Sequence, residues 1–231
     1  MIVSAHTVFI SGGTGYMGRV LTAQLAARGH RVRALARRGS EQKVAAGVEA
    51  VLGSALEAAS FSPQVHGCDT FVHLTGVAHP APWKEREFRA IDLASLRASA
   101  EAARAAGVTH FVYVSVAHPA PMMKAYIRVR SECESILAGL GLTCTILRPW
   151  YVLGPGHRWP VVLKPVYALL ESFAATREGA RRLGLVTLEE MTAALLWAAE
   201  NPPAETRILD VPAIRACRAP ASAAMASQAS S

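Results

Sequence analysis

The sequence is short of acidic residues, aromatic residues, paired cysteines and long apolar runs. It has 17 Asp and Glu against 24 Lys and Arg, a formal net charge of +7, and 6% aromatic residues. The basic residues lie in short groups without interleaved aromatic side chains, which argues against a nucleic-acid partner. No apolar run reaches the ~20 residues that cross a bilayer, and Lys164 and Pro165 interrupt the apolar segment 160–170. We therefore expect neither a nucleic-acid partner nor a membrane span.

The four cysteines show neither C-x-x-C spacing nor a metal-ligand pattern with the histidines. Free thiols of this kind are typical of a reducing cytosol. Residues 1–10 contain no basic segment ahead of an apolar core, so no signal peptide is expected. These observations predict a cytoplasmic protein without a bound metal.

Hydrophobic residues are plentiful, at 52% of 231 residues, which is enough for one sizeable core. Short apolar runs alternate with segments of helical periodicity, and this alternation favours parallel βαβ units with both sheet faces covered. The predicted strands span 7–12, 31–37, 48–54, 69–76, 110–116 and 143–149, and the predicted helices span 17–30, 41–47, 85–108 and 125–141. The predicted fold class is α/β, a doubly wound parallel sheet.

The alternation loosens after Pro149. We expect a loop over 150–160, a helix over 161–173, and then a short strand or turn followed by an amphipathic helix. Thr187 is placed to cap that last helix, with Glu189 and Glu190 in its favourable first turn. The low-complexity segment 218–231 is expected to be a flexible tail.

The stretch FISGGTGYMGR, residues 9–19, places glycines between the first strand and the first helix. In such a turn one glycine permits the tight bend, one admits a pyrophosphate to the backbone, and one lets helix and strand pack closely. The free N–H groups of the helix N-terminus then face the phosphates. The alternative is an ordinary glycine turn. The dinucleotide interpretation assigns the whole loop to cofactor binding: Gly12, Gly13, Thr14, Gly15, Tyr16, Met17 and Gly18.

The form GGTGYMG resembles the extended and atypical branches of the short-chain dehydrogenase/reductase family. FVHLTG, FVYVSV, LRPWYVLGPG and LVTLEEMTAAL are similar to later family segments, so the resemblance covers nearly the whole chain. It implies a single NAD(P)-binding Rossmann-like domain over 1–217, in which 150–212 form a small substrate-side region. It further implies that Leu74, Thr75, Gly76 and Pro149 line the cofactor, and that Ser54 stands where the family often has an adenine-binding Asp.

The second strand ends without the acidic residue that holds the ribose 2′-hydroxyl in NAD-binding proteins. Arg37 and Arg38 stand there instead, and no acid follows until Glu41. Because arginine makes charge-assisted contacts with phosphate, the sequence favours NADP(H), with NAD(H) possible. The alternative is that both arginines are simply solvated.

The enzymes of the resembled family use a Tyr, a Lys four residues later and a Ser or Thr near the fifth strand. The corresponding residues here are Tyr126 and Arg130, which share a helix face, while Val116 stands at the hydroxyl position beside Ser115. The resemblance implies that Tyr126, Arg130 and Ser115 form the catalytic group, with Tyr126 as proton donor. The alternative is a half-buried helix tyrosine and a surface arginine.

Trp150, His157 and Arg158 are weaker candidates for substrate contacts, because they lie in the loop beside the expected cleft. Two functions stay open. One is an oxidoreductase or epimerase-like enzyme acting on a small carbonyl, quinone or sugar-like substrate. The other is a non-catalytic redox sensor or accessory subunit resembling the NmrA-like branch, in which the active Tyr and Lys are often lost. The sequence does not indicate an oligomeric state.

Overall fold

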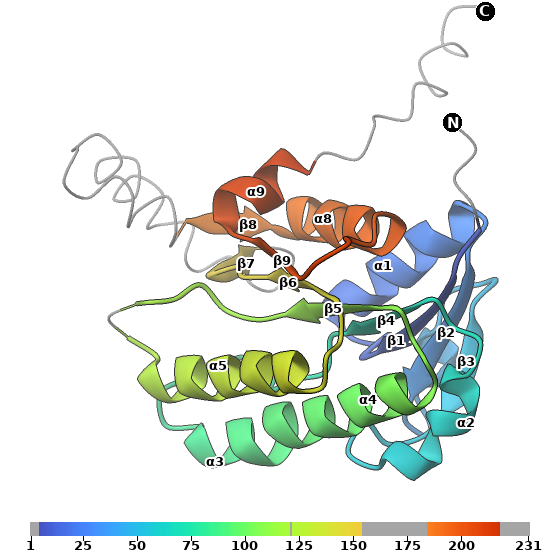
Figure 1. The fold of residues 1–231 in the computed structure, drawn as a ribbon, viewed down its shortest axis with the longest axis horizontal. Coiled ribbons are helices and arrows are strands. Elements are labelled where there is room, and N and C mark those ends of the chain that lie inside the picture. The colour runs from blue at the N-terminus through green and yellow to red at the C-terminus, as the bar shows by residue number, and fades with distance from the viewer. Residues whose placement is uncertain (1–4, 121, 154–183, 218–231) are drawn as a thin grey trace, which may run out of the picture.

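The computed structural model describes residues 5–120, 122–153 and 184–217. Seven parallel strands form its main sheet in the order β3-β2-β1-β4-β5-β6-β9 (Figure 1). The strands are β1 (Thr7–Ser11), β2 (Arg31–Ala36), β3 (Glu49–Leu52), β4 (Thr70–His73), β5 (His110–Val114), β6 (Cys144–Leu147) and β9 (Arg207–Leu209). The chain winds outward from β1 to β3, then returns to β4 beside β1, so the winding direction reverses there. The predicted doubly wound α/β sheet is confirmed.

Helices cover both faces of this sheet (Figure 1). One face carries α1 (Tyr16–Ala27), α8 (Leu188–Glu200) and α9 (Val211–Ala216), and the other carries α4 (Ala94–Ala105) and α5 (Lys124–Gly139). The central strands are buried on both faces, which is why they read as continuous apolar runs rather than alternating ones. Shorter elements complete the described chain: α2 (Ser62–Val65), α3 (Glu85–Glu87), η1 (Glu41–Lys43), η2 (Ala58–Ser60) and the π-helical turn η3 (Phe88–Leu93).

A second, two-stranded parallel sheet pairs β7 (Tyr151–Leu153) with β8 (Leu185–Thr187). Strand β7 lies within the segment predicted as a loop over 150–160, so that prediction is wrong for residues 151–153. Thr187 does cap α8 in a capping box, since its side chain accepts from the Glu190 amide and the Glu190 carboxylate accepts from the Thr187 amide. The predicted helix over 161–173 and the tail 218–231 lie outside the described residues.

One further prediction needs correction, and two elements were not predicted. The helix expected over 41–47 is only the turn η1, followed by extended backbone at Val44, because so short a segment cannot offset the cost of helix nucleation. The helix expected over 85–108 is confirmed over 85–105, where α3, the π-helical segment η3 and α4 follow one another without a break. The strand β9 and the helix α9 were not predicted.

Within the described residues, no helix combines the length and the apolar character that crossing a membrane requires.

Candidate functional site

The glycine loop leaves β1 and enters α1 with no room for side chains. Gly12 adopts a φ of +77°, and a Cβ there would lie 2.8 Å from the Leu74 carbonyl carbon. A Cβ on Gly18 would lie 2.2 Å from the Gly12 oxygen, and one on Gly13 would lie 2.8 Å from the Ala34 Cβ. The loop is therefore held between the carboxyl end of β4 and strand β2. The predicted cofactor residues of the loop and of the Leu74–Gly76 segment lie together.

The first turn of α1 is open to a ligand. Gly15 is its N-cap and supplies no side-chain hydrogen bond, and no acidic residue lies in that turn. Thr75 Oγ1, at the end of β4 beside this loop, is buried without a hydrogen-bond partner among the described residues. A cradle that only glycine can line and an unpartnered hydroxyl beside it fit the phosphates and ribose of a dinucleotide.

Arg37 and Arg38 follow directly after β2, which is the neighbour of β1 in the sheet. Both side chains are exposed, and neither forms an ion pair within the part of the chain that the structure describes. They thus place two exposed positive charges at the carboxyl edge of the sheet, one strand away from the glycine loop.

Ser54 follows β3 at the same edge, but its polar groups serve its own turn. Its amide donates to Ser60 Oγ over 2.9 Å, and its hydroxyl accepts from the Leu56 amide over 3.3 Å. These contacts hold the turn after β3, and the role of Ser54 at the adenine stays a prediction.

The structure places Tyr126 and Arg130 one turn apart on α5, with the Arg130 guanidinium 5.0 Å from the centre of the Tyr126 ring. Tyr126 is half-buried and packs against Phe88, with ring centres 4.8 Å apart. Arg130 is a buried residue, not a surface charge. Its Nη2 lies 2.5 Å from Oδ1 of Asp92, a buried carboxylate on η3 that sequence reasoning did not single out.

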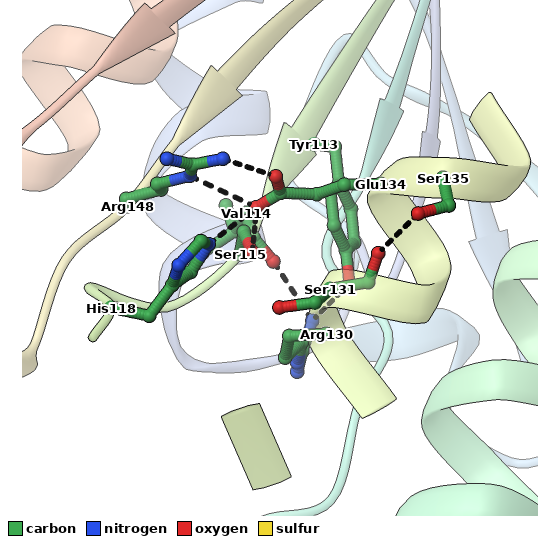
Figure 2. A network of polar contacts seen from close by, with 9 residues as sticks. All are labelled: Tyr113, Val114, Ser115, His118, Arg130, Ser131, Glu134, Ser135 and Arg148. Carbon is green, nitrogen blue, oxygen red and sulfur yellow. Dashed lines mark hydrogen bonds and ion pairs between the residues drawn. The ribbon is translucent and has the colours of Figure 1, made fainter. Parts of the chain in front are cut away.

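Ser115 turns away from this pair, towards the middle of α5. Its hydroxyl donates to Glu134 over 2.5 Å, and Arg148, which follows β6, forms an ion pair with the same carboxylate. Figure 2 shows Ser115, His118 and Arg148 converging on Glu134. The His118 Nε2 atom is 3.7 Å from that carboxylate. Ser115 therefore joins a Glu134-centred network that ties the ends of β5 and β6 to α5.

The electrostatics differ around each ionisable group. Burial raises the pKa of Tyr126, and the neighbouring Arg130 charge opposes that rise. The Arg130 pKa is raised well above its ordinary value, because Tyr113, Tyr126 and Asp92 outweigh the effect of burial. His73 on β4 is fully buried, and burial followed by the Arg130 charge lowers its pKa to about 3. At neutral pH these buried groups are therefore a permanent cation, neutral phenols and a neutral imidazole.

Four further predicted site residues follow β6: Pro149, Trp150, His157 and Arg158. Pro149 is buried, and its carbonyl accepts from the Ala117 amide over 2.9 Å. Trp150 is half-buried beside it. His157 and Arg158 lie outside the described residues. Among the described residues, no three His, Cys, Asp or Glu side chains form a group that could hold a metal ion.

Asp92, Glu134 and Arg148 were missed by the sequence reasoning. Each lies inside a segment with an evident structural role, so no local pattern separates it from ordinary helix or strand-end residues. Asp92 is recognised as part of the site only because the structure pairs it with Arg130.

A family model described as NAD(P)H-binding matches residues 12–163. Two curated relatives are named as reductases. The chain is 29% identical over 168 residues to the 4-hydroxy-2-methyl-3-oxo-4-farnesyl-3,4-dihydroquinoline-1-oxide ketoreductase of Stigmatella aurantiaca, covering 63% of this chain and 50% of that protein. It is 30% identical over 151 residues to the ceramide reductase of Caulobacter vibrioides, covering 64% and 47%. The chain thus spans about half the length of these two relatives.

Solved structures of the same fold include the Bordetella bronchiseptica enzyme WbmH in complex with NAD+. Its TM-score against this chain is 0.66 at 20% identity, covering 89% of this chain and 75% of that one. At this identity the likeness extends to the fold and carries no assignment of substrate.

Proposed function

Since the chain belongs to the NAD(P)H-binding family of short-chain dehydrogenase/reductase-like proteins, we propose that it is an NADP(H)-dependent oxidoreductase that reduces a carbonyl group. The observation that carries this proposal is the glycine cradle beside two exposed arginines. The cradle takes the pyrophosphate at the N-terminus of α1. Arg37 and Arg38 stand one strand away, where the 2′-phosphate of NADP(H) needs a positive partner.

The bound nicotinamide would supply hydride to the substrate carbon. The chain's own contribution is to hold Tyr126 beside the carbonyl oxygen as proton donor. Arg130 keeps its positive charge at every relevant pH and cannot relay a proton itself. We assign it to holding the phenol ring in place, with its guanidinium 5.0 Å from the ring centre. Ser115 contributes by fixing the end of β5 through Glu134 rather than by contacting the substrate.

For the substrate we propose a carbonyl compound with an apolar portion. Trp83 and Met122 are 82% and 61% exposed, and they lie in the loops that follow the neighbouring strands β4 and β5. Large exposed apolar side chains at a sheet's carboxyl edge suit an apolar ligand. The two relatives named as reductases, one of them for a farnesyl-bearing ketone, support the choice of carbonyl reduction.

The cofactor assignment is tested by titrating the protein with NADPH and NADH while following nucleotide fluorescence. Arg37→Ala combined with Arg38→Ala should weaken NADPH binding by about tenfold or more, because a charge-assisted contact is worth about 1.5–3 kcal/mol. NADH binding should change little. Equal weakening of both nucleotides would remove the 2′-phosphate assignment, and no binding of either by the unaltered protein would overturn the cofactor proposal.

The catalytic assignment is tested by adding quinones and ketones with and without apolar chains to the NADPH complex. Tyr126→Phe should abolish NADPH consumption and leave NADPH affinity unchanged, since only the phenolic oxygen is lost. Undiminished consumption by this variant would exclude Tyr126 as the proton donor.

A non-catalytic NAD(P)-binding sensor is the second candidate. Val116, buried at the position of the family hydroxyl, and Arg130, engaged with Asp92, favour it. A sensor should bind NADPH and consume none with any carbonyl compound of the series.

A further inference from the structure

Asp92 is the least expected residue near the site. It lies on the π-helical turn η3 and is 1% exposed. One carboxylate oxygen is 2.5 Å from Arg130 Nη2, and the other accepts from the Val77 amide over 3.0 Å. A buried carboxylate is tolerated only when it is paired and hydrogen-bonded in this way. Single π-helical turns often occur at functional positions.

The Arg130 guanidinium is clamped from several elements at once. Its Nη1 donates to the Val114 carbonyl over 2.8 Å and to the Tyr113 hydroxyl over 3.2 Å (Figure 2). A Cβ on Gly76 would lie 2.7 Å from its Nη2 and 3.0 Å from Asp92 Oδ1. Gly76, which is also predicted to line the cofactor, therefore leaves the room that this ion pair occupies. The guanidinium cannot move away from Tyr126 without breaking these contacts.

The charges around Tyr126 oppose one another. Arg130, on the same helix as Tyr126, favours the phenolate, while Asp92 disfavours it. Asp92 lies on η3, whose Phe88 packs against the Tyr126 ring. Cys133 on α5 also disfavours the phenolate. An isolated buried cation this close would draw the phenol towards ionisation, whereas a neutralised ion pair has a much smaller effect.

We propose that Asp92 is a positioning residue that holds Arg130 against Tyr126 and cancels its charge, so that Tyr126 stays a neutral phenol. This inference rests on the proposed function, in which the phenol is the proton donor. As the substrate carbon accepts hydride, the phenol O–H bond breaks and the proton forms the O–H bond of the product alcohol. The Tyr126 phenolate left beside Arg130 then takes a proton from solvent.

The test is a pH titration of the protein labelled with carbon-13 at the tyrosine Cζ, whose NMR shift reports phenol ionisation. Tyr126→Phe identifies the signal of Tyr126 among the five tyrosines. Asp92→Asn should lower the midpoint of Tyr126 ionisation by about one to three pH units, because it leaves Arg130 uncompensated. Asp69→Asn is the matched control: Asp69 accepts from the Thr7 amide at the opposite end of the sheet, so the midpoint should not move. An unchanged midpoint in folded Asp92→Asn protein overturns the proposal.

A second pair of variants serves if Asp92→Asn does not fold. Arg130→Gln leaves the Asp92 carboxylate uncompensated, and Arg130→Gln with Asp92→Asn leaves neither charge. Tyr126 should ionise at a higher pH in the single variant than in the double variant, and equal midpoints would overturn the proposal. The titration needs neither nucleotide nor substrate. If the midpoint of Tyr126 ionisation shifts but NADPH does not bind, only the proposed function is overturned. If NADPH is consumed but the midpoint does not shift, only the role of Asp92 is overturned.

Discussion

At the scale of single residues, steric contact decides where glycine is needed. Gly18 lies in the first turn of α1, and the Gly12 oxygen occupies the place of its missing Cβ. Gly139, at the end of α5, is exposed, and no described atom lies within 4 Å of the place that a Cβ would take there. Gly18 therefore cannot accept a side chain, whereas Gly139 can. The spacing of glycines in the sequence indicates this requirement only for the loop.

Gly18→Ala should lower the free energy of unfolding by about 1–3 kcal/mol, as overpacking does, and should weaken NADPH binding because the cradle must widen. Urea denaturation and NADPH titration measure the two effects. Gly139→Ala is the control and should leave binding unchanged while adding up to about 1 kcal/mol of stability. Equal behaviour of the two variants would contradict the cradle.

At the scale of elements, local signals set which segments are helical and where they begin, but not the hydrogen-bonding pattern inside each helix. The capping box at Thr187 starts α8 as the sequence predicts. The helix over 85–105 is continuous, as its periodicity predicts, but the segment η3 within it is π-helical. The carboxylate of Asp92, on this turn, binds both Arg130 and the Val77 amide. These partners are far away in sequence, so no periodicity within the segment could reveal them.

Thr187→Ala should lower the free energy of unfolding by about 1 kcal/mol, because the Glu190 amide loses its side-chain acceptor. Thr187→Ser keeps the hydroxyl and should lose far less. Chemical denaturation of both variants gives the comparison. A loss of the same size in both would show that the methyl group, not the cap, matters.

At the scale of the whole molecule, two cores lie on either side of one sheet, and polar groups are buried within them. His110 on β5 is buried between Thr70 and Thr145, with 2.9 Å from its Nε2 to Thr145 Oγ1. Burial, followed by the charge of Arg207, lowers its pKa to about 4. With His73, whose pKa is about 3, the folded sheet encloses two imidazoles that stay neutral well below the pH at which they ionise in the unfolded chain.

The free energy of unfolding should therefore fall as the pH drops from about 6.5 towards 4. In that window the unfolded chain binds protons that the folded chain does not, so each such histidine costs up to about 1.4 kcal/mol per pH unit. Urea denaturation between pH 7 and 4.5 gives the slope. His110→Gln should reduce the slope relative to the unaltered protein. The same slope in both proteins would show that His110 does not contribute.

The sequence by itself determined the sheet-and-helix alternation, the glycine cradle, the arginines after β2 and the cap of α8. All of these depend on neighbours within a few residues, where backbone geometry and steric contact act directly. Tertiary structure alone decided that β9 completes the sheet, that Ser115 faces Glu134, and that Arg130 is buried against Asp92. These outcomes depend on which distant segments the parallel crossovers bring together. A charge such as that of Arg130 acquires its role only from the partner buried beside it.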